Sequence, residues 1–284
     1  MNDLQKKILD IFKEVADLCR KNDIRYYAIG GTAIGAARHQ GFIPWDDDLD
    51  IAIPIEMYDR FIEAARRELP DHLRVVTPSD VQHYPSFFIK VVDVTTTFIE
   101  KKYIEFPDAW DGVFIDIMPL SGVPEKKGER KRYLRRWKRT AMLNYARRFP
   151  RSRMATRARV AAHSLLAPLS GRIPFDYFTE KMFREFRRRP LSSSAHTGYV
   201  WSVRLEKLIF DAEDFGEGVL LPFEDTYINC PAGYDRYLTI QFGNYMELPP
   251  KEKRVGVHPA VVDLDHPYTD YLGGGPLADR ILRQ

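Results

Sequence analysis

The chain has 284 residues, of which 44% are hydrophobic and 29% are charged, as in an ordinary globular protein. This length allows one elaborated domain or two small ones, and the composition gives no sign of a fibrous or disordered chain. No window approaches the ~18 apolar residues that span a bilayer, and the first residues form an amphipathic pattern rather than a secretory signal. We therefore expect a cytoplasmic protein, either free or lying on the inner face of the membrane.

The overall charge of +3 conceals a strong asymmetry. Residues 126–159 contain 15 Lys or Arg and one acid, Glu129, so this basic block carries +14 and the remainder about −11. The two cysteines, Cys19 and Cys230, match no metal-binding spacing. They suit buried thiols in a reducing compartment, with a single disulfide as the alternative.

Helical and strand-like patterns alternate over the first 120 residues, which predicts an α/β (α+β) fold in which helices flank a mixed sheet. A helix is expected over 3–22 and a strand over 24–29, with Thr32 placed to cap a helix over 33–38. Further along, we expect strands over 48–53, 73–76, 86–92, 97–104 and 111–118, and a helix over roughly 55–68.

After Pro119 the pattern becomes helical and basic over 125–188, then strand-like over 198–221, and 231–246 reads as a helix broken near Gly243. We predict a single catalytic domain over 1–284. Its expected parts are a core at 20–120, a basic helical insertion at 124–190, a C-terminal completion at 191–260 and a loose tail at 261–284.

Three aspartates are candidate metal ligands. Side chains alternate along a strand, so Asp48 and Asp50 are expected on one face while Leu49 and Ile51 face the core. Adjacent carboxylates raise each other's pKa, and Mg²⁺ (or Mn²⁺) removes that conflict. Asp116 lies in the apolar run GVFIDIMPL, where an unpaired charge is costly, so we expect it to supply a third ligand from a neighbouring strand.

A glycine pair, Gly30 and Gly31, precedes a predicted helix start, where backbone N–H groups and the helix dipole favour a phosphate. A phosphate cradle followed by an Asp-x-Asp strand is what metal-assisted phosphoryl transfer needs. Each feature has an ordinary alternative: a glycine pair is a turn, an Asp-rich loop is solvated surface, and a buried Asp is salt-bridged. Their occurrence together and in this order favours the functional interpretation.

These motifs resemble the LicD family of phosphotransferases, whose animal relatives include fukutin and fukutin-related protein. The residues that carry the resemblance are GGTAIGAARHQGFIPWDDDLDI (30–51), KVVDVTTTFIE (90–100), GVFIDIMPL (112–120), and YDRYLTIQFGNYMELPP (234–250) followed by His258. Phe242 and Asn244 depart from the family pattern, which has Tyr and Asp there.

The resemblance implies a nucleotidyltransferase-type fold and a Mg²⁺-dependent activity. Such an enzyme moves a phosphorylated alcohol, such as phosphocholine or ribitol phosphate, from a CDP-linked donor to a glycan or lipid-linked glycan acceptor at the cell surface. Residue by residue, it implies that Asp48, Asp50 and Asp116 are the catalytic metal-binding carboxylates and that Gly30, Gly31 and Thr32 form the donor-phosphate loop. It places Arg38, His39, Lys90 and Asp93 toward the donor. Surface cations remain the alternative for Arg38 and Lys90, and a structural role the alternative for His39.

Other functions stay open at this point. An Asp-x-Asp glycosyltransferase, an enzyme that transfers the nucleotidyl group itself, and a catalytically inactive glycan-binding relative are the rivals. The basic block has three interpretations, because Leu134, Trp137, Ala141 and Tyr145 form an apolar stripe flanked by Arg and Lys. It suits a helix on an anionic membrane surface or facing an anionic acceptor, or a merely solvated helix. Nucleic acid is disfavoured because the block matches no nucleic-acid-binding motif.

Overall fold

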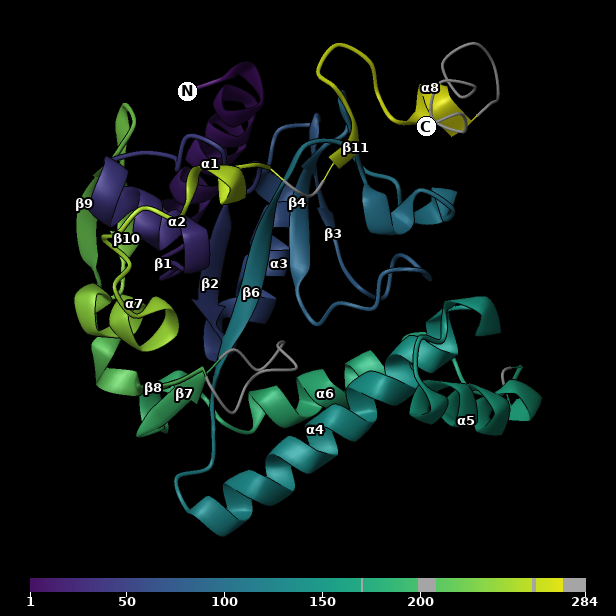
Figure 1. Cartoon of the computed structure of the whole chain (residues 1–284). Helices are drawn as coiled ribbons and strands as arrows, with labels where there is room; N and C mark the ends of the chain where they lie inside the picture. Colours follow the sequence, from purple (N-terminus) through teal and green to yellow (C-terminus); the bar gives the residue numbers. More distant parts are fainter. Residues whose placement is uncertain (170, 199–207, 257–258, 273–284) are drawn as a thin grey trace.

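The structure is a computed structural model that describes residues 1–169, 171–198, 208–256 and 259–272. A twisted mixed sheet forms its centre, which confirms the predicted α+β class (Figure 1). β2 and β6 run parallel, and the other paired strands are antiparallel. In spatial order the strands are β1 (Tyr27–Ala28), β2 (Asp50–Pro54), β6 (Phe114–Gly122), β4 (Ile89–Asp93) and β3 (Leu73–Val76).

Two amphipathic helices, α1 (Asp3–Lys21) and α3 (Ile55–Glu68), pack together behind the sheet in Figure 1. α1 begins at a capping box, in which the side chain of Asn2 accepts from the backbone N–H of Gln5 and the side chain of Gln5 accepts from that of Asn2. The predicted apolar face of this helix is confirmed, since all five of its members are buried: Ile8, Ile11, Phe12, Val15 and Leu18.

The segment after β1 differs from the prediction. Helix α2 (Gly30–Ile34) begins two residues before Thr32 and continues into a π-helix, Gly35–His39. Thr32 is therefore no N-cap; its hydroxyl accepts a hydrogen bond from the backbone N–H of Asp50 instead. β2 begins at Asp50, so Asp48 precedes the strand rather than lying within it.

The expected loose tail is partly regular structure. β11 (Pro259–Asp263) pairs with β5 (Thr97–Glu100), and α8 (Thr269–Leu272) follows, with Tyr271 buried beside Ile99 and Trp110. The prediction of a loose tail is therefore wrong for 261–272, because strand pairing and aromatic burial hold that stretch. Residues 273–284 lie outside the described part.

The basic insertion contains α4 (Lys127–Arg148), α5 (Arg157–Leu166) and α6 (Tyr177–Arg187), as the helical pattern predicted. The apolar stripe on α4 faces the protein, which removes it as a membrane contact. Trp137 is 1% exposed and packs on Phe87, and the other stripe residues pack against the two main hydrophobic clusters.

The C-terminal part adds small sheets and one helix. β7 (His196–Gly198) pairs with the end of β6 and with β8 (Ile209–Asp211), while β9 (Val219–Phe223) and β10 (Thr226–Cys230) form a hairpin. α7 (Tyr234–Phe242) ends at Gly243, whose φ of +71° marks the predicted break. The strand-like run predicted over 198–221 includes 199–207, which lie outside the described residues.

Two sequence expectations can be compared directly with the structure. Cys19 and Cys230 are both buried and carry free thiols. Within the described ranges, no helix combines the length and the apolar composition needed to cross a membrane.

One buried arginine attaches the insertion to the sheet. Arg148, at the end of α4, is 1% exposed and donates to the carbonyl oxygens of Pro78, Val81 and Gln82. It also donates to the side chains of Asn144 and Thr179, which belong to α4 and α6. This single side chain therefore joins two helices of the insertion to the connection between β3 and β4.

Replacing Arg148 with leucine tests that attachment. Arg148→Leu removes the donor from three carbonyl groups, of which that of Pro78 is buried, so we expect a loss of about 3 kcal/mol in the free energy of unfolding, measured by urea denaturation. The matched control is Arg139→Leu on the exposed face of the same helix, where a change within about 0.5 kcal/mol is expected. Equal stability of the two variants would contradict this role for Arg148.

Candidate functional site

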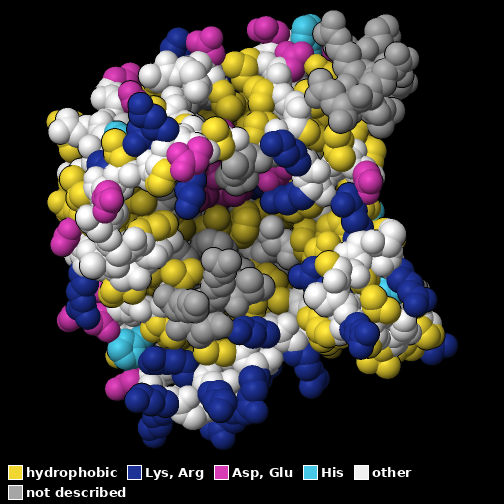
Figure 2. Space-filling model, viewed as in Figure 1, with side chains coloured by type: hydrophobic (Ala, Val, Ile, Leu, Met, Phe, Trp, Pro, Cys, Tyr) yellow, Lys and Arg dark blue, Asp and Glu magenta, His cyan; other side chains and the backbone are white. Residues whose placement is uncertain are grey.

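Several carboxylates meet where β2 and β6 run side by side. Asp50 and Asp116 are register partners in the parallel pair, so their side chains lie on the same face of the sheet. Asp48 stands just before β2, and ligand oxygens of Asp46, Asp47 and Asp48 all lie within 4.8 Å of one another. Figure 2 shows acidic side chains near the middle of this face, beside a hollow in which hydrophobic side chains are visible.

Burial makes this cluster electrostatically unfavourable without a cation. The pKa of Asp50 is raised well above its ordinary value, mainly by burial and further by the charges of Asp48, Asp116 and Asp46. Burial likewise raises the pKa of Asp116 to about 7, although Lys90 acts to lower it. These are oxygen ligands of the kind that Mg²⁺ and Mn²⁺ take.

Asp116 has one carboxylate oxygen that no hydrogen-bond donor of the described residues reaches. Its Oδ1 is buried and has no hydrogen-bond partner among the described residues. A buried acceptor without a donor is costly, and native proteins leave few of them. A hard divalent cation bound by this oxygen, with Asp48 and Asp50, would satisfy it, so the residues present fit the metal that the sequence analysis expects.

Lys90 is the third member of this row of cross-strand partners, opposite Asp116 on β4. Its ammonium group is 3.0 Å from Oε2 of Glu100 and lies 3.5 Å from the ring centroid of Phe114. Burial acts to raise the pKa of Glu100, but Lys90 and Lys102 lower it to about 2, so this carboxylate stays charged. Lys90 is therefore fixed beside the acidic cluster by a buried ion pair.

The predicted phosphate loop packs directly on the acidic cluster. Gly30 begins α2 with φ +57°, and a Cβ there would lie 3.5 Å from Oδ2 of Asp50. A Cβ on Gly31 would lie 2.8 Å from Oδ2 of Asp46, too close to be accommodated without a shift. Gly30 thus suits its positive φ and Gly31 its close approach to Asp46, and the first N–H groups of α2 have no acceptor within the helix.

Tyr237 and Thr32 hold that loop in place. The buried hydroxyl of Tyr237, on α7, accepts from the N–H of Gly30 at 2.9 Å, and Thr32 accepts from the N–H of Asp50 at 2.8 Å. The hydrogen bond of Tyr237 connects the C-terminal part of the chain to the site. The sequence analysis did not assign Tyr237 to the site, although it lies in the late block that resembles the family.

Arg38 and His39 lie on the π-helix and have structural partners. Arg38 donates to the carbonyl groups of Tyr245 and Glu247 and to Nε2 of His39. Burial, followed by the charge of Arg38, lowers the pKa of His39, whose ring meets Trp45 edge-on. Their contact with a donor stays a prediction, and in this structure Arg38 ties the segment after α7 to the loop before the acidic cluster.

Asp93 is not brought to the cluster. It lies three residues after Lys90 on β4, and an odd separation along a strand places two side chains on opposite faces. Its carboxylate is buried, accepts from Thr95 and pairs with Lys7 of α1 at 3.3 Å. The structure therefore gives Asp93 partners in a turn and in the helical layer behind the sheet.

A groove of 480 Å³ lies between the segment 85–88 and α4. Its segment 85–88 directly precedes β4, the strand that carries Lys90. Aromatic side chains, among them Phe87, Trp137 and Tyr145, line it, and it also contains Lys138 and Arg159.

Sequence reasoning missed Asp46, Asp47 and Glu100. The run of three aspartates at 46–48 was a visible signal for the first two, although exposed acidic side chains often lie together without binding a metal. Glu100 could be suspected only from its place at the end of the apolar run TTTFIE. Its partner Lys90 comes from another strand, a pairing that the sequence does not reveal.

Comparison with known proteins agrees with this geometry. A family model described as "LicD/FKTN/FKRP, nucleotidyltransferase domain" matches residues 23–155, which include the glycine pair and all the aspartates of the site. The lipopolysaccharide cholinephosphotransferase LicD of Haemophilus influenzae is 28% identical over 257 residues, covering 88% of this chain and 92% of that protein. Uncharacterised proteins of Rickettsia typhi and Rickettsia prowazekii are 50% and 51% identical over 52 and 51 residues, 17% of this chain in each case. Residues 23–155 therefore form a domain of the LicD type, and the chain is an enzyme of the transferase class.

Proposed function

We propose that this enzyme transfers a phosphorylated small alcohol from a CDP-activated donor to a hydroxyl group of a cell-surface glycan. The observation that carries the proposal is the row of Asp50 and Asp116, with the partnerless oxygen of Asp116, directly against the glycine turn at Gly30. Phosphocholine is the first alcohol phosphate to test, because the relative in Haemophilus influenzae is a cholinephosphotransferase.

Asp48, Asp50 and Asp116 would hold one or two Mg²⁺ or Mn²⁺ ions. Such a cation, when bound, neutralises charge on the phosphate and on the leaving group. The hydroxyl oxygen of the acceptor attacks the phosphorus that bears the alcohol, the bond from phosphorus to the CMP oxygen breaks, and CMP leaves with that electron pair. The proton of the hydroxyl passes to solvent, so the reaction is balanced without a further reactant.

The backbone around Gly30 and Gly31 would receive the donor phosphates. The N–H of Gly30 is held by the hydroxyl of Tyr237, which fixes the turn, so the N–H groups from Gly31 onward would approach the phosphate oxygens. Lys90 would stabilise the site electrostatically, because its buried positive charge offsets part of the negative charge of the aspartates.

The groove beside α4 would hold the acceptor rather than the choline group. The partly exposed side chain of Phe88 suits a sugar ring, and Lys138 and Arg159 suit phosphate or carboxylate groups on a glycan. A quaternary ammonium group would be repelled by the same two cations. This charge pattern favours an anionic glycan as the acceptor.

Loss of the aspartates tests the reaction. In an assay that measures CMP released from CDP-choline in the presence of lipopolysaccharide glycan, we expect Asp48→Ala and Asp116→Ala to lower turnover at least ~1,000-fold, because metal-bound charge stabilisation is worth several kcal/mol. The matched control is Asp10→Ala on the exposed face of α1, where no change is expected.

The products separate this proposal from its rivals. Pyrophosphate in place of CMP would identify transfer of the nucleotidyl group, and a sugar transferred from a UDP- or GDP-linked donor would identify a glycosyltransferase. Turnover that survives in either aspartate variant would refute the assignment of the metal ligands.

The raised pKa of Asp116 predicts how metal binding depends on pH. Without metal, the folded protein holds a proton on this group, whose pKa is about 7 against an ordinary 3.8, more tightly than the unfolded chain does. This group therefore makes the metal-free protein less stable as pH rises from about 4 to about 7. A cation competes with that proton, so the rise in Tm caused by Mg²⁺ should be several degrees larger near pH 8 than near pH 6.

Asp116→Asn provides the control for this measurement, because the amide has no proton to lose in this range. Its metal-free Tm should fall less than that of the original protein as pH rises, and its response to Mg²⁺ should be small at both pH values. A Mg²⁺ response that is independent of pH, or unchanged in Asp116→Asn, would contradict the proposed ligand set.

A further inference from the structure

The basic insertion contains a long stretch without acids. Between Glu129 and Asp176 there is no Asp or Glu, whereas residues 130–175 contain 14 Lys or Arg. The rest of the chain is net negative, so this stretch concentrates positive charge in one region of the molecule. In Figure 2 the Lys and Arg side chains gather along the lower edge, where Figure 1 places α4.

The cations of α4 cover the side of the helix that faces away from the protein. Seven of them are exposed, among them the five outer cations Lys127, Lys131, Arg132, Arg135 and Arg139. At about 100° per residue these five fall within an arc of about 140°. The buried residues of the same helix, among them Tyr133, Trp137, Thr140 and Asn144, fall on the opposite side.

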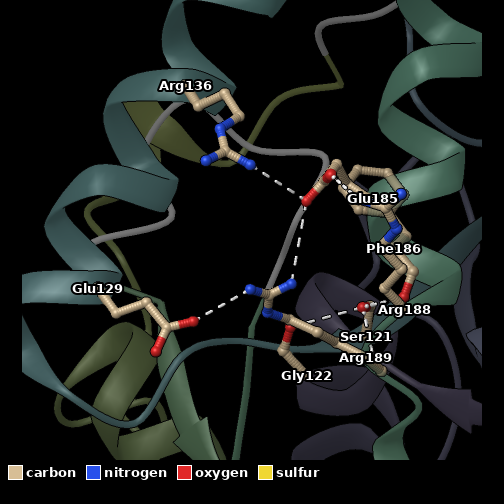
Figure 3. Close-up of polar contacts among 8 residues, drawn as sticks. All are labelled: Ser121, Gly122, Glu129, Arg136, Glu185, Phe186, Arg188 and Arg189. Atoms are coloured by element: carbon tan, nitrogen blue, oxygen red, sulfur yellow. Dashed lines mark hydrogen bonds and ion pairs between the residues drawn. The ribbon is translucent and has the colours of Figure 1, made fainter.

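Three other arginines of the insertion have acidic partners within the protein: Arg136, Arg188 and Arg189. Figure 3 shows Glu185 in ion pairs with Arg136, Arg188 and Arg189, and Arg189 in a further ion pair with Glu129. No carboxylate of the described residues lies within ion-pair distance of the five outer cations of α4. Their charge is therefore available to a partner outside the molecule.

Exposed apolar side chains lie on the neighbouring helix. α5 packs against α4, and Leu165 at its end is 69% exposed, with Leu169 just beyond it 42% exposed. α5 packs against the C-terminal half of α4, whereas four of the five outer cations lie on its N-terminal half. Exposed leucines and basic residues on neighbouring helices are the pattern of a protein that rests on a lipid surface, with cations at the headgroups and short apolar contacts below them.

We propose that the outer face of α4, together with Leu165 and Leu169 of the adjoining helix, docks on an anionic lipid bilayer. The five cations span about 18 Å along a convex ridge, which suits contact with a plane rather than enclosure of a strand. A long soluble polyanion that wrapped around the molecule would meet the net negative remainder, whereas a plane touches only this side. Docking in this way would place a lipid-linked acceptor at the edge of the face that carries the acidic cluster.

Vesicle sedimentation tests the proposal without any donor or acceptor, so its result is independent of the proposed reaction. The full chain is expected to bind vesicles of phosphatidylcholine mixed with phosphatidylglycerol, and not vesicles of phosphatidylcholine alone. Binding should be lost when salt is raised from about 0.1 M to several times that value, because exposed charges are screened. Equally weak binding to both kinds of vesicle, or no binding to either, would overturn the proposal.

The triple variant Lys131→Ala/Arg135→Ala/Arg139→Ala should lower the affinity for anionic vesicles on the order of 100-fold, since each basic residue near the surface contributes about fivefold. The matched control removes three exposed cations from α1 and α3 as Lys21→Ala/Arg60→Ala/Arg67→Ala, and should bind as the original chain does. Leu165→Ser/Leu169→Ser should weaken binding several-fold while keeping its salt dependence. Equal loss in the two triple variants would overturn the assignment to α4.

Two competitors separate the lipid surface from other anions. Inorganic phosphate at low millimolar concentration should leave vesicle binding unchanged, and displacement by it would show an ordinary phosphate site instead. Double-stranded DNA should bind more weakly than the vesicles at the same charge concentration; tighter binding of DNA would overturn the proposal in favour of a nucleic-acid surface.

Discussion

The repulsion among carboxylates buried at the junction of β2 and β6 is the constraint around which the site is built. Parallel pairing sets Asp50 directly beside Asp116, and the turn before β2 adds Asp48 to the same place. No protein donor reaches Oδ1 of Asp116 among the described residues. The divalent cation that we propose for this place would relieve both the repulsion and the cost of desolvation.

The surrounding elements reduce the electrostatic repulsion in the cluster and hold the glycine turn against it. Lys90 brings a positive charge to the neighbouring strand, and Glu100 holds it there from β5. On the other side of the cluster, Gly30 lets α2 start against Asp50, and Tyr237 of α7 holds that turn. Segments far apart in the sequence thus meet on the central strands of the sheet, which explains why the family resemblance occurs in separated blocks.

Local patterns predicted much of this structure, and long-range pairing accounts for most of what they missed. The face of α1 followed from its helical period, and the strand holding Asp116 followed from its apolar run. Thr32 was assigned to a helix cap because the sequence cannot show that β2 would offer it the N–H of Asp50. Asp93 could have been excluded from the donor side, since its odd distance from Lys90 reverses its face on β4. The register that brings Asp50 beside Asp116 depends on a pairing between distant strands, which no local pattern encodes.

Anomalous diffraction from crystals grown with Mn²⁺ tests the central claim most directly, because it locates the cation without reference to turnover. The account predicts a peak within about 2.2 Å of carboxylate oxygens from both Asp50 and Asp116, including Oδ1 of Asp116, with Asp48 completing the protein ligands. A peak held by Asp46, Asp47 and Asp48 alone, or no peak beside Asp50 and Asp116, would contradict it.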